Sequence, residues 1–225
     1  MNNRSLIDRL TSATQSLATA NSASGGGAGR QPRNRAETET PTEWCLATFA
    51  GRFTEISGSS ASASLTLVSQ LVLETQKQHE PVAWITTRKS TFYPPDAAEA
   101  GIDITAVAVV RGVNNIVAAR TAEHLMRSGA FGLVVFDLGA DTHLPQHAQS
   151  RLAGQARRHH AALICITEKD SHQPSLGSLI SLRAHTERLP QTNRRFRCRA
   201  TVLKDKQCGP GWNYEAFCHG PDGLY

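Results

Sequence analysis

The segment with the clearest chemical potential runs from Phe53 to Thr66. A strand-like stretch, Phe53–Ile56, leads through Gly58 into a loop of serines and alanines, and an apolar, helix-forming run follows. A strand, a loop of small residues and a helix in this order form the context of a phosphate-binding loop, in which backbone N–H groups and a lysine hold phosphates. No lysine or arginine lies between Gly58 and Thr66, so this segment lacks the cation of such a site.

A second candidate is a basic segment near the C-terminus. Between Arg183 and Lys206 there are eight basic and two acidic residues, which leaves sixteen basic and seventeen acidic residues elsewhere. Such a block can bind the phosphates of nucleic acid, although it is also compatible with a solvated or protein-binding strand. Alternation predicts that three of its arginines share one strand face, where no stacking aromatic residue is obvious. The candidate DNA-binding residues are Arg194, Arg195, Arg197, Arg199, Lys204 and Lys206.

Other constellations are weaker. Asp141, His143 and His147 lie close together in sequence, but histidines near helix ends are usually solvated, and no metal is expected. The five cysteines form no C-x₂-C pair and are expected to be reduced thiols, as in intracellular proteins. No apolar run approaches the roughly 20 residues that span a bilayer, so a soluble cytoplasmic protein without a membrane partner is expected.

The N-terminal part differs in composition from the rest. Residues 1–20 favour a helix, residues 21–43 contain glycine, serine, proline and charge and favour a flexible linker, and residues 44–225 favour a single core. The apolar side of the helix either packs on the protein's own core or binds a partner. Its candidate partner-binding residues are Leu6, Ile7 and Leu10.

From Trp44 onward, patterns of strands and helices alternate. Alternation predicts an α/β fold with a mostly parallel twisted sheet flanked by helices, and antiparallel strands at the C-terminus. An apolar stripe including Leu65 and Val68 is expected to face the core from the first helix. The predicted strands are Phe53–Ile56, Val82–Thr86 and Thr105–Val110 (both buried), Leu133–Asp137, Ala162–Thr167, Leu179–Arg183, Arg195–Leu203 and Trp212–His219; the predicted helices are Ala61–Gln78, Asn115–Arg127 and Leu144–His160.

Several of these motifs together resemble the core of RecA-type recombinases. Gly51–Gly58 resembles the family's G-R-hydrophobic-x-E-I-x-G, which leads into its phosphate-binding loop. Gly101–Asp103 resembles the family's G-V-D, and Met126–Ala130 followed by Leu133–Asp137 resembles its R-S-G-A and V-V-V-D. The resemblance covers about residues 50–225 and implies a RecA-like core.

The resemblance also locates the nucleotide site and shows departures from it. The family's phosphate-binding lysine falls on Ser64, its magnesium-binding hydroxyl on Leu65, and the preceding glycine on Ala63. The second nucleotide carboxylate is matched by Asp137, but the water-activating carboxylate falls near Arg88. We therefore expect no catalytic residues, no nucleotide cofactor and no enzyme activity. The degenerate nucleotide site comprises Gly58, Ala63, Ser64, Leu65 and Asp137.

The tail, Val202–Trp212 and Gly220–Tyr225, resembles the end of ImuA-type proteins, short RecA relatives that accompany error-prone DNA synthesis in bacteria. The resemblance implies a nucleoid-associated adaptor in SOS mutagenesis. Its partners would be RecA, an ImuB-like polymerase homologue and a DnaE-type error-prone polymerase, with single-stranded DNA as a further candidate. Two alternatives stay open: a SulA-like SOS inhibitor of cell division, and a RecA paralogue that still binds DNA in an ATP-dependent way.

Overall fold

The computed structural model describes residues 43–59, 62–87, 92–190 and 195–219, so the N-terminal helix and nearly all of the linker expected from the sequence lie outside it. The described strands form one sheet in the order β3-β2-β4-β5-β1-β6-β7-β8. Their bounds are β1 Phe53–Ser57, β2 Val82–Thr86, β3 Val107–Arg111, β4 Leu133–Gly139, β5 Ala162–Thr167, β6 Leu182–Pro190, β7 Arg195–Asp205 and β8 Asn213–His219.

The sheet has a parallel and an antiparallel part. Strands β1 to β5 pair in parallel, and β6 joins them by pairing in parallel with β1. Strands β6, β7 and β8 are joined to one another by antiparallel ladders. This arrangement confirms the predicted α/β fold, with its mostly parallel sheet and antiparallel C-terminal strands.

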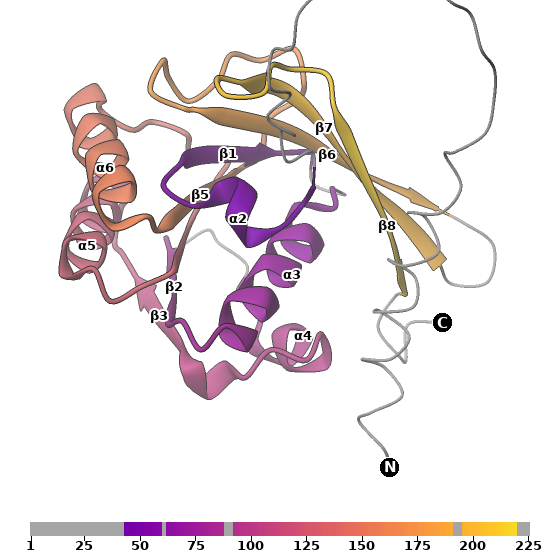
Figure 1. The fold of residues 1–225 in the computed structure, drawn as a ribbon, viewed down its shortest axis with the longest axis horizontal. Helices are drawn as coiled ribbons and strands as arrows, with labels where there is room; N and C mark the ends of the chain where they lie inside the picture. The colour runs from indigo at the N-terminus through magenta and orange to yellow at the C-terminus, as the bar shows by residue number, and fades with distance from the viewer. Residues whose placement is uncertain (1–42, 60–61, 88–91, 191–194, 220–225) are drawn as a thin grey trace, which may run out of the picture. The chain divides into compact units, whose positions relative to one another are not determined.

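Helices cover both faces of the parallel part (Figure 1). Helices α5 and α6 pack on one face together with Val134 and Phe136 of β4, while α2 and α3 pack on the other with Leu133 and Val135. Alternate residues of a strand point to opposite faces, so a run of apolar residues fills both layers. The helices are α2 Leu46–Phe49, α3 Ser64–Lys77, α4 Pro94–Glu99, α5 Asn115–Ser128 and α6 Gln146–His159, with a 3₁₀ turn at Ile104–Ala106.

The short helices α2 and α4 were not expected from the sequence, and three further details differ from the expectations. The expected buried strand Thr105–Val110 is a 3₁₀ turn followed by β3, and Val109 is 39% exposed because β3 lies at the edge of the described sheet. Leu65 is not part of the buried stripe of α3; Leu67 takes its place. Strand β6 runs well beyond its expected end at Arg183, because its polar residues mask the strand pattern.

A buried ion pair joins the start of β1 to the end of β7. Arg52 Nη2 lies 2.6 Å from Asp205 Oδ1, and both side chains are almost fully buried. Burial acts to raise the pKa of Asp205, but hydrogen bonds from Arg52 and from the backbone N–H groups of Gln207 and Cys208 outweigh it and keep the pKa below its ordinary value. The pair therefore anchors the antiparallel strands to the parallel core.

Candidate functional site

The predicted phosphate-binding loop lies between β1 and α3 and keeps a tight turn. A Cβ added to Gly58 would come within 2.3 Å of Ser62 Cβ and 2.8 Å of the Thr186 carbonyl oxygen, so only glycine fits there. The Gly58 N–H donates to the Thr167 carbonyl at 3.2 Å, and the Ser62 N–H donates to the Ser59 carbonyl at 3.0 Å. The turn that precedes the helix is therefore present.

The side chain at the lysine position is bound inside the protein. Ser62 Oγ donates to Ser64 Oγ at 3.0 Å, and Ser64 Oγ lies 2.7 Å from Thr186 Oγ1 on β6. Thr186 Oγ1 in turn donates to the Ser57 carbonyl at 3.2 Å. These neutral hydroxyls satisfy one another, so Ser64 offers neither a positive charge nor a free hydroxyl to a phosphate.

The residues on either side of Ser64 have apolar side chains. Ala63 is fully buried at the start of α3 and makes no side-chain cap, whereas the Leu65 side chain is 39% exposed. A hard cation such as Mg²⁺ needs oxygen ligands, which neither side chain supplies. Among the described residues of the loop, 58–59 and 62–66, no side chain carries a positive charge.

The second nucleotide carboxylate expected from the sequence, Asp137, is present on β4. Asp137 lies near the end of β4, directly opposite Thr86 of β2, and is almost fully buried. Its Oδ1 accepts a hydrogen bond from the Gly139 N–H at 3.2 Å. Arg88, near which the resemblance to RecA-type recombinases places the water-activating carboxylate, lies outside the described residues. The structure thus brings Gly58, Ala63, Ser64 and Leu65 together in the loop and retains the acidic residue of the strand.

Sequence reasoning did not find a buried charge cluster around Glu55, in the middle of β1. The Glu55 carboxylate lies 3.0 Å from Lys169 Nζ and 3.8 Å from Arg183 Nε. It also accepts hydrogen bonds from Thr167 Oγ1 at 3.1 Å and from the Leu176 N–H at 2.8 Å. A charged residue within a fully buried strand was the available signal, because such a residue requires partners.

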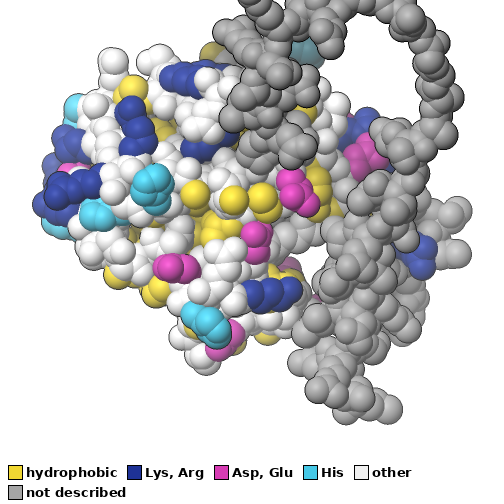
Figure 2. All heavy atoms as spheres, viewed as in Figure 1, with side chains coloured by type: hydrophobic (Ala, Val, Ile, Leu, Met, Phe, Trp, Pro, Cys, Tyr) yellow, Lys and Arg dark blue, Asp and Glu magenta, His cyan; other side chains and the backbone are white. Residues whose placement is uncertain are grey.

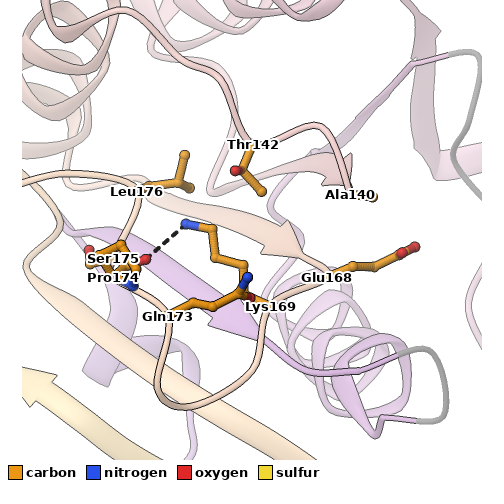
Figure 3. Close-up of a pocket in the computed structure, with 8 residues that line it drawn as sticks. All are labelled: Ala140, Thr142, Glu168, Lys169, Gln173, Pro174, Ser175 and Leu176. Carbon is orange, nitrogen blue, oxygen red and sulfur yellow. Dashed lines mark hydrogen bonds between the residues drawn. The ribbon is translucent and has the colours of Figure 1, made fainter.

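A cavity of about 310 Å³ lies beside this cluster, at the carboxyl ends of β4 and β5. Figure 3 shows the Lys169 side chain reaching across it to the Pro174 carbonyl, to which Nζ donates at 3.1 Å. Lys169 is also paired with Glu55, a carboxylate that it shares with Arg183, so these three residues together keep one net positive charge. The lining residues are Ala140, Thr142, Glu168, Lys169, Gln173, Pro174, Ser175 and Leu176.

The predicted basic surface is partly neutralised. Arg197 Nη1 and Arg199 Nε lie 3.6 Å and 2.6 Å from the carboxylate of Glu215 on β8, whereas Arg195 is exposed. The expectation that this face lacks an aromatic side chain is wrong, because Phe217 stands directly opposite Arg197 in the ladder and is 49% exposed.

The lysines of the same prediction lie at the other end of β7. Lys204 Nζ donates to the Gly177 carbonyl at 3.4 Å, and Lys206 Nζ donates to the Ser178 carbonyl at 2.6 Å. Burial, together with the nearby charge of Lys206, lowers the pKa of Lys204. Arg194 lies outside the described residues, so the six predicted residues do not form one described surface.

Leu6, Ile7 and Leu10 also lie outside the described residues. Large apolar side chains are exposed elsewhere in the described chain, and sequence reasoning missed them because valine-rich runs normally indicate burial. Val109 on β3 is opposite Trp84 and so lies on the face of the sheet that α2 and α3 cover. Val113, Ile116 and Val117 lie before and at the start of α5, which packs on the other face.

Within the described ranges, no group of three or more histidine, cysteine or acidic side chains is arranged to hold a metal ion, and this includes the cluster around His143. No described helix has the length and apolarity needed to cross a membrane.

Comparisons with known proteins place this geometry in a family. The model of the RecA N-terminal domain matches residues 47–168. Protein RecA of Chlorobaculum tepidum is 34% identical over 87 residues, which is 39% of this chain and 25% of that protein. Protein RecA of Cytophaga hutchinsonii is 36% identical over 87 residues, or 39% and 24% of the two chains. Protein RecA of Ruminococcus albus is 34% identical over 121 residues, or 48% and 30%.

These matches span only about a quarter to a third of the length of the curated relatives. The family model's match includes both the strand that leads into the degenerate loop and the strand that carries Asp137. Since the RecA N-terminal domain covers more than half of the chain, this protein belongs to the RecA N-terminal domain family.

Proposed function

We propose that this protein is a non-catalytic adaptor in the bacterial DNA-damage response, of the ImuA type. It would link RecA to error-prone translesion synthesis by an ImuB-like polymerase homologue and a DnaE-type polymerase, and would associate with the nucleoid. The observation that carries the proposal is the neutral hydrogen-bond chain from Ser62 through Ser64 to Thr186, which occupies the position of the phosphate-binding lysine.

The free-energy cost of replacing the lysine by Ser64 supports a loss of nucleotide binding, and with it of nucleotide turnover. A hydrogen bond to a charged group contributes about 1.5–3 kcal/mol, so losing the lysine alone weakens phosphate binding by roughly ten- to hundredfold. The oxygen ligand for magnesium is also replaced, by Leu65, which removes a second source of charge neutralisation. Backbone N–H groups at the start of α3 are what remains for a phosphate.

An adaptor also needs a surface for other proteins. The apolar residues on β3 and α5 are of the kind that protein interfaces bury, and β3 has one unpaired edge in the described sheet. The family resemblance implies that protomers join when an N-terminal helix and an extended segment pack on the next core. These observations support two contacts between this chain and RecA. One would be made by the β3 edge, and the other by Leu6, Ile7 and Leu10.

Nucleotide binding is tested by calorimetry with ATP and Mg²⁺. The protein as it stands should show no tight binding, whereas restoring the family's residues with A63G/S64K/L65T should increase the affinity at least tenfold. Tight, Mg²⁺-dependent binding by the unchanged protein would contradict the proposal and favour a RecA paralogue that still uses ATP.

Partner binding is tested by purifying the tagged protein from DNA-damaged cells. RecA and the two polymerase-type proteins should be recovered, and L6D/L10D should abolish the recovery of RecA without changing the melting temperature. The control is N2D/N3D, which adds the same charge to polar positions of the same segment. Recovery of the cell-division machinery in place of the polymerases would favour the SulA-like alternative.

A further inference from the structure

Helices α5 and α6 form a basic surface that sequence reasoning did not identify. The two helices carry five arginines and one carboxylate, Glu123. Figure 2 shows Lys, Arg and His side chains gathered at the side of the molecule where Figure 1 places these helices. The two helices are separate in sequence, and acidic residues elsewhere in the chain offset their positive charge when the whole chain is summed. The arginines are Arg120, Arg127, Arg151, Arg157 and Arg158.

The only carboxylate of the two helices is used to hold them together. Glu123 on α5 accepts from Arg151 on α6 at 2.6 Å and from Arg127, one turn along α5, at 2.7 Å. The hydrogen bond from Arg151 lowers the pKa of Glu123, against the effect of burial and with help from Arg127. Arg120 and Arg158 are exposed and have no ion pair with any described carboxylate. The two helices are therefore joined through Glu123, and the surface keeps a net positive charge.

The exposed face of α6 carries a glycine between two of its basic residues. His147, Arg151, Gly154 and Arg158 are spaced four, three and four residues apart, so they form one stripe along the helix. Glycine in a helix interior costs about 1 kcal/mol relative to alanine. A Cβ added to Gly154 would meet nothing within 4 Å, so no packing inside the protein requires glycine there. Its effect is to let an opposing surface approach closely between two arginines.

The chemistry of this face indicates the kind of partner. None of the large exposed hydrophobic side chains lies on α6, whereas Ile116 and Val117 at the start of α5 are exposed. From Glu123 of α5 through α6, the surface therefore lacks the apolar anchors on which protein interfaces depend. It also carries no Phe, Tyr or Trp side chain on which the bases of a single strand could stack. Arginines on rigid helices are suited to phosphates at fixed positions.

We infer that the α5–α6 surface binds the phosphate backbone of double-stranded nucleic acid, with little dependence on base sequence. This site is separate from the degenerate phosphate loop and from the arginines of β7. The inference goes beyond the proposed function and does not rest on it, because backbone binding requires neither ATP nor a protein partner.

The test is fluorescence anisotropy with a labelled DNA duplex at several salt concentrations. R120Q/R158Q should weaken duplex binding about tenfold at low salt and reduce the slope of log K against log salt by roughly 1.8, since each phosphate contact contributes about 0.9. The matched control, K77Q/R111Q on α3 and β3, removes the same charge from exposed positions outside this surface and should retain duplex binding. Circular dichroism establishes that each variant is folded.

A second pair of variants separates charge from shape. Gly154→Glu and Gly154→Gln add side chains of similar size at a position with open space, so both should fold. Gly154→Glu should bind the duplex several-fold more weakly than Gly154→Gln. Three results would each overturn the inference. The first is unchanged duplex binding by R120Q/R158Q, and the second is equal duplex binding by the two Gly154 variants. The third is that the protein binds a single strand or a polyglutamate peptide more strongly than the duplex.

Discussion

Strand β1 and the loop that follows it use charge in opposite ways. Arg52, just before β1, and Glu55, within it, are buried charged residues, and each has a partner of opposite charge at 3.0 Å or less. The described residues of the loop, a few positions later, carry no charged side chain, and their polar groups are satisfied by the chain from Ser62 to Thr186. The two regions are adjacent, yet one is strongly charged and the other is neutral.

The difference shows which function the charge serves in this molecule. Arg52 ties β1 to the end of β7, and Glu55 ties it to Lys169 after β5 and Arg183 on β6. These pairs join segments that are more than 100 residues apart in sequence. Arg52 and Asp205 cancel each other, whereas Glu55 is shared by Lys169 and Arg183, so that cluster keeps one net positive charge within the protein. A nucleotide site needs an uncompensated cation, and the described loop has none. Charge around β1 therefore stabilises the fold.

The largest change in stability is expected for Glu55→Gln, which tests the role of the buried charges of β1. The variant keeps the shape of the side chain but leaves Lys169 and Arg183 buried without their carboxylate, so it should reduce the free energy of unfolding by about 3–5 kcal/mol. Urea denaturation followed by circular dichroism measures the change. The control is Glu187→Gln on exposed β6 surface, which should change stability by less than about 0.5 kcal/mol. Equal effects of the two variants would show that Glu55 is not a structural charge.

The next largest effect is expected from Asp205→Asn, which should cost about 2 kcal/mol at neutral pH. Hydrogen bonds from Arg52 and two backbone N–H groups outweigh burial and lower the pKa of Asp205 in the folded protein. A lowered pKa stabilises the fold above the pKa of the unfolded chain, and this contribution is lost as the pH falls through the folded value. The stability difference between wild type and variant should therefore shrink below about pH 4. A difference that grows in acid would contradict this.

The neutral loop should show a smaller effect. Ser64→Ala leaves Thr186 Oγ1 without one buried partner and should cost about 1 kcal/mol in urea denaturation. If the two hydroxyls mainly satisfy each other, S64A/T186V should cost less than the sum of the two single variants. Strict additivity would show that the chain of hydroxyls is not a unit.

The comparison also explains how far the sequence could predict the molecule. The alternation of strands and helices predicted the parallel core, and the absence of lysine at Ser64 was visible because a phosphate-binding loop is local. The partner of Ser64 is Thr186, 122 positions away, which no local pattern reveals. The exposed edge at Val109 depends on the order of the strands, and the basic surface of α5 and α6 depends on two helices meeting in space. Properties that arise from long-range neighbours were therefore the ones missed.

The smallest effect is expected where paired charges are exposed. Arg199 pairs with Glu215 at 2.6 Å, but both side chains are about one-third exposed, so water competes for each charge. Arg199→Gln should lower the free energy of unfolding by at most about 1 kcal/mol at low salt, and the difference should disappear in 1 M NaCl because salt screens exposed charges. Glu55→Gln, measured at the same two salt concentrations, should keep most of its effect because its partners are buried. If both variants lost their effect in salt, burial would not be what distinguishes the charges of β1 from those of the surface.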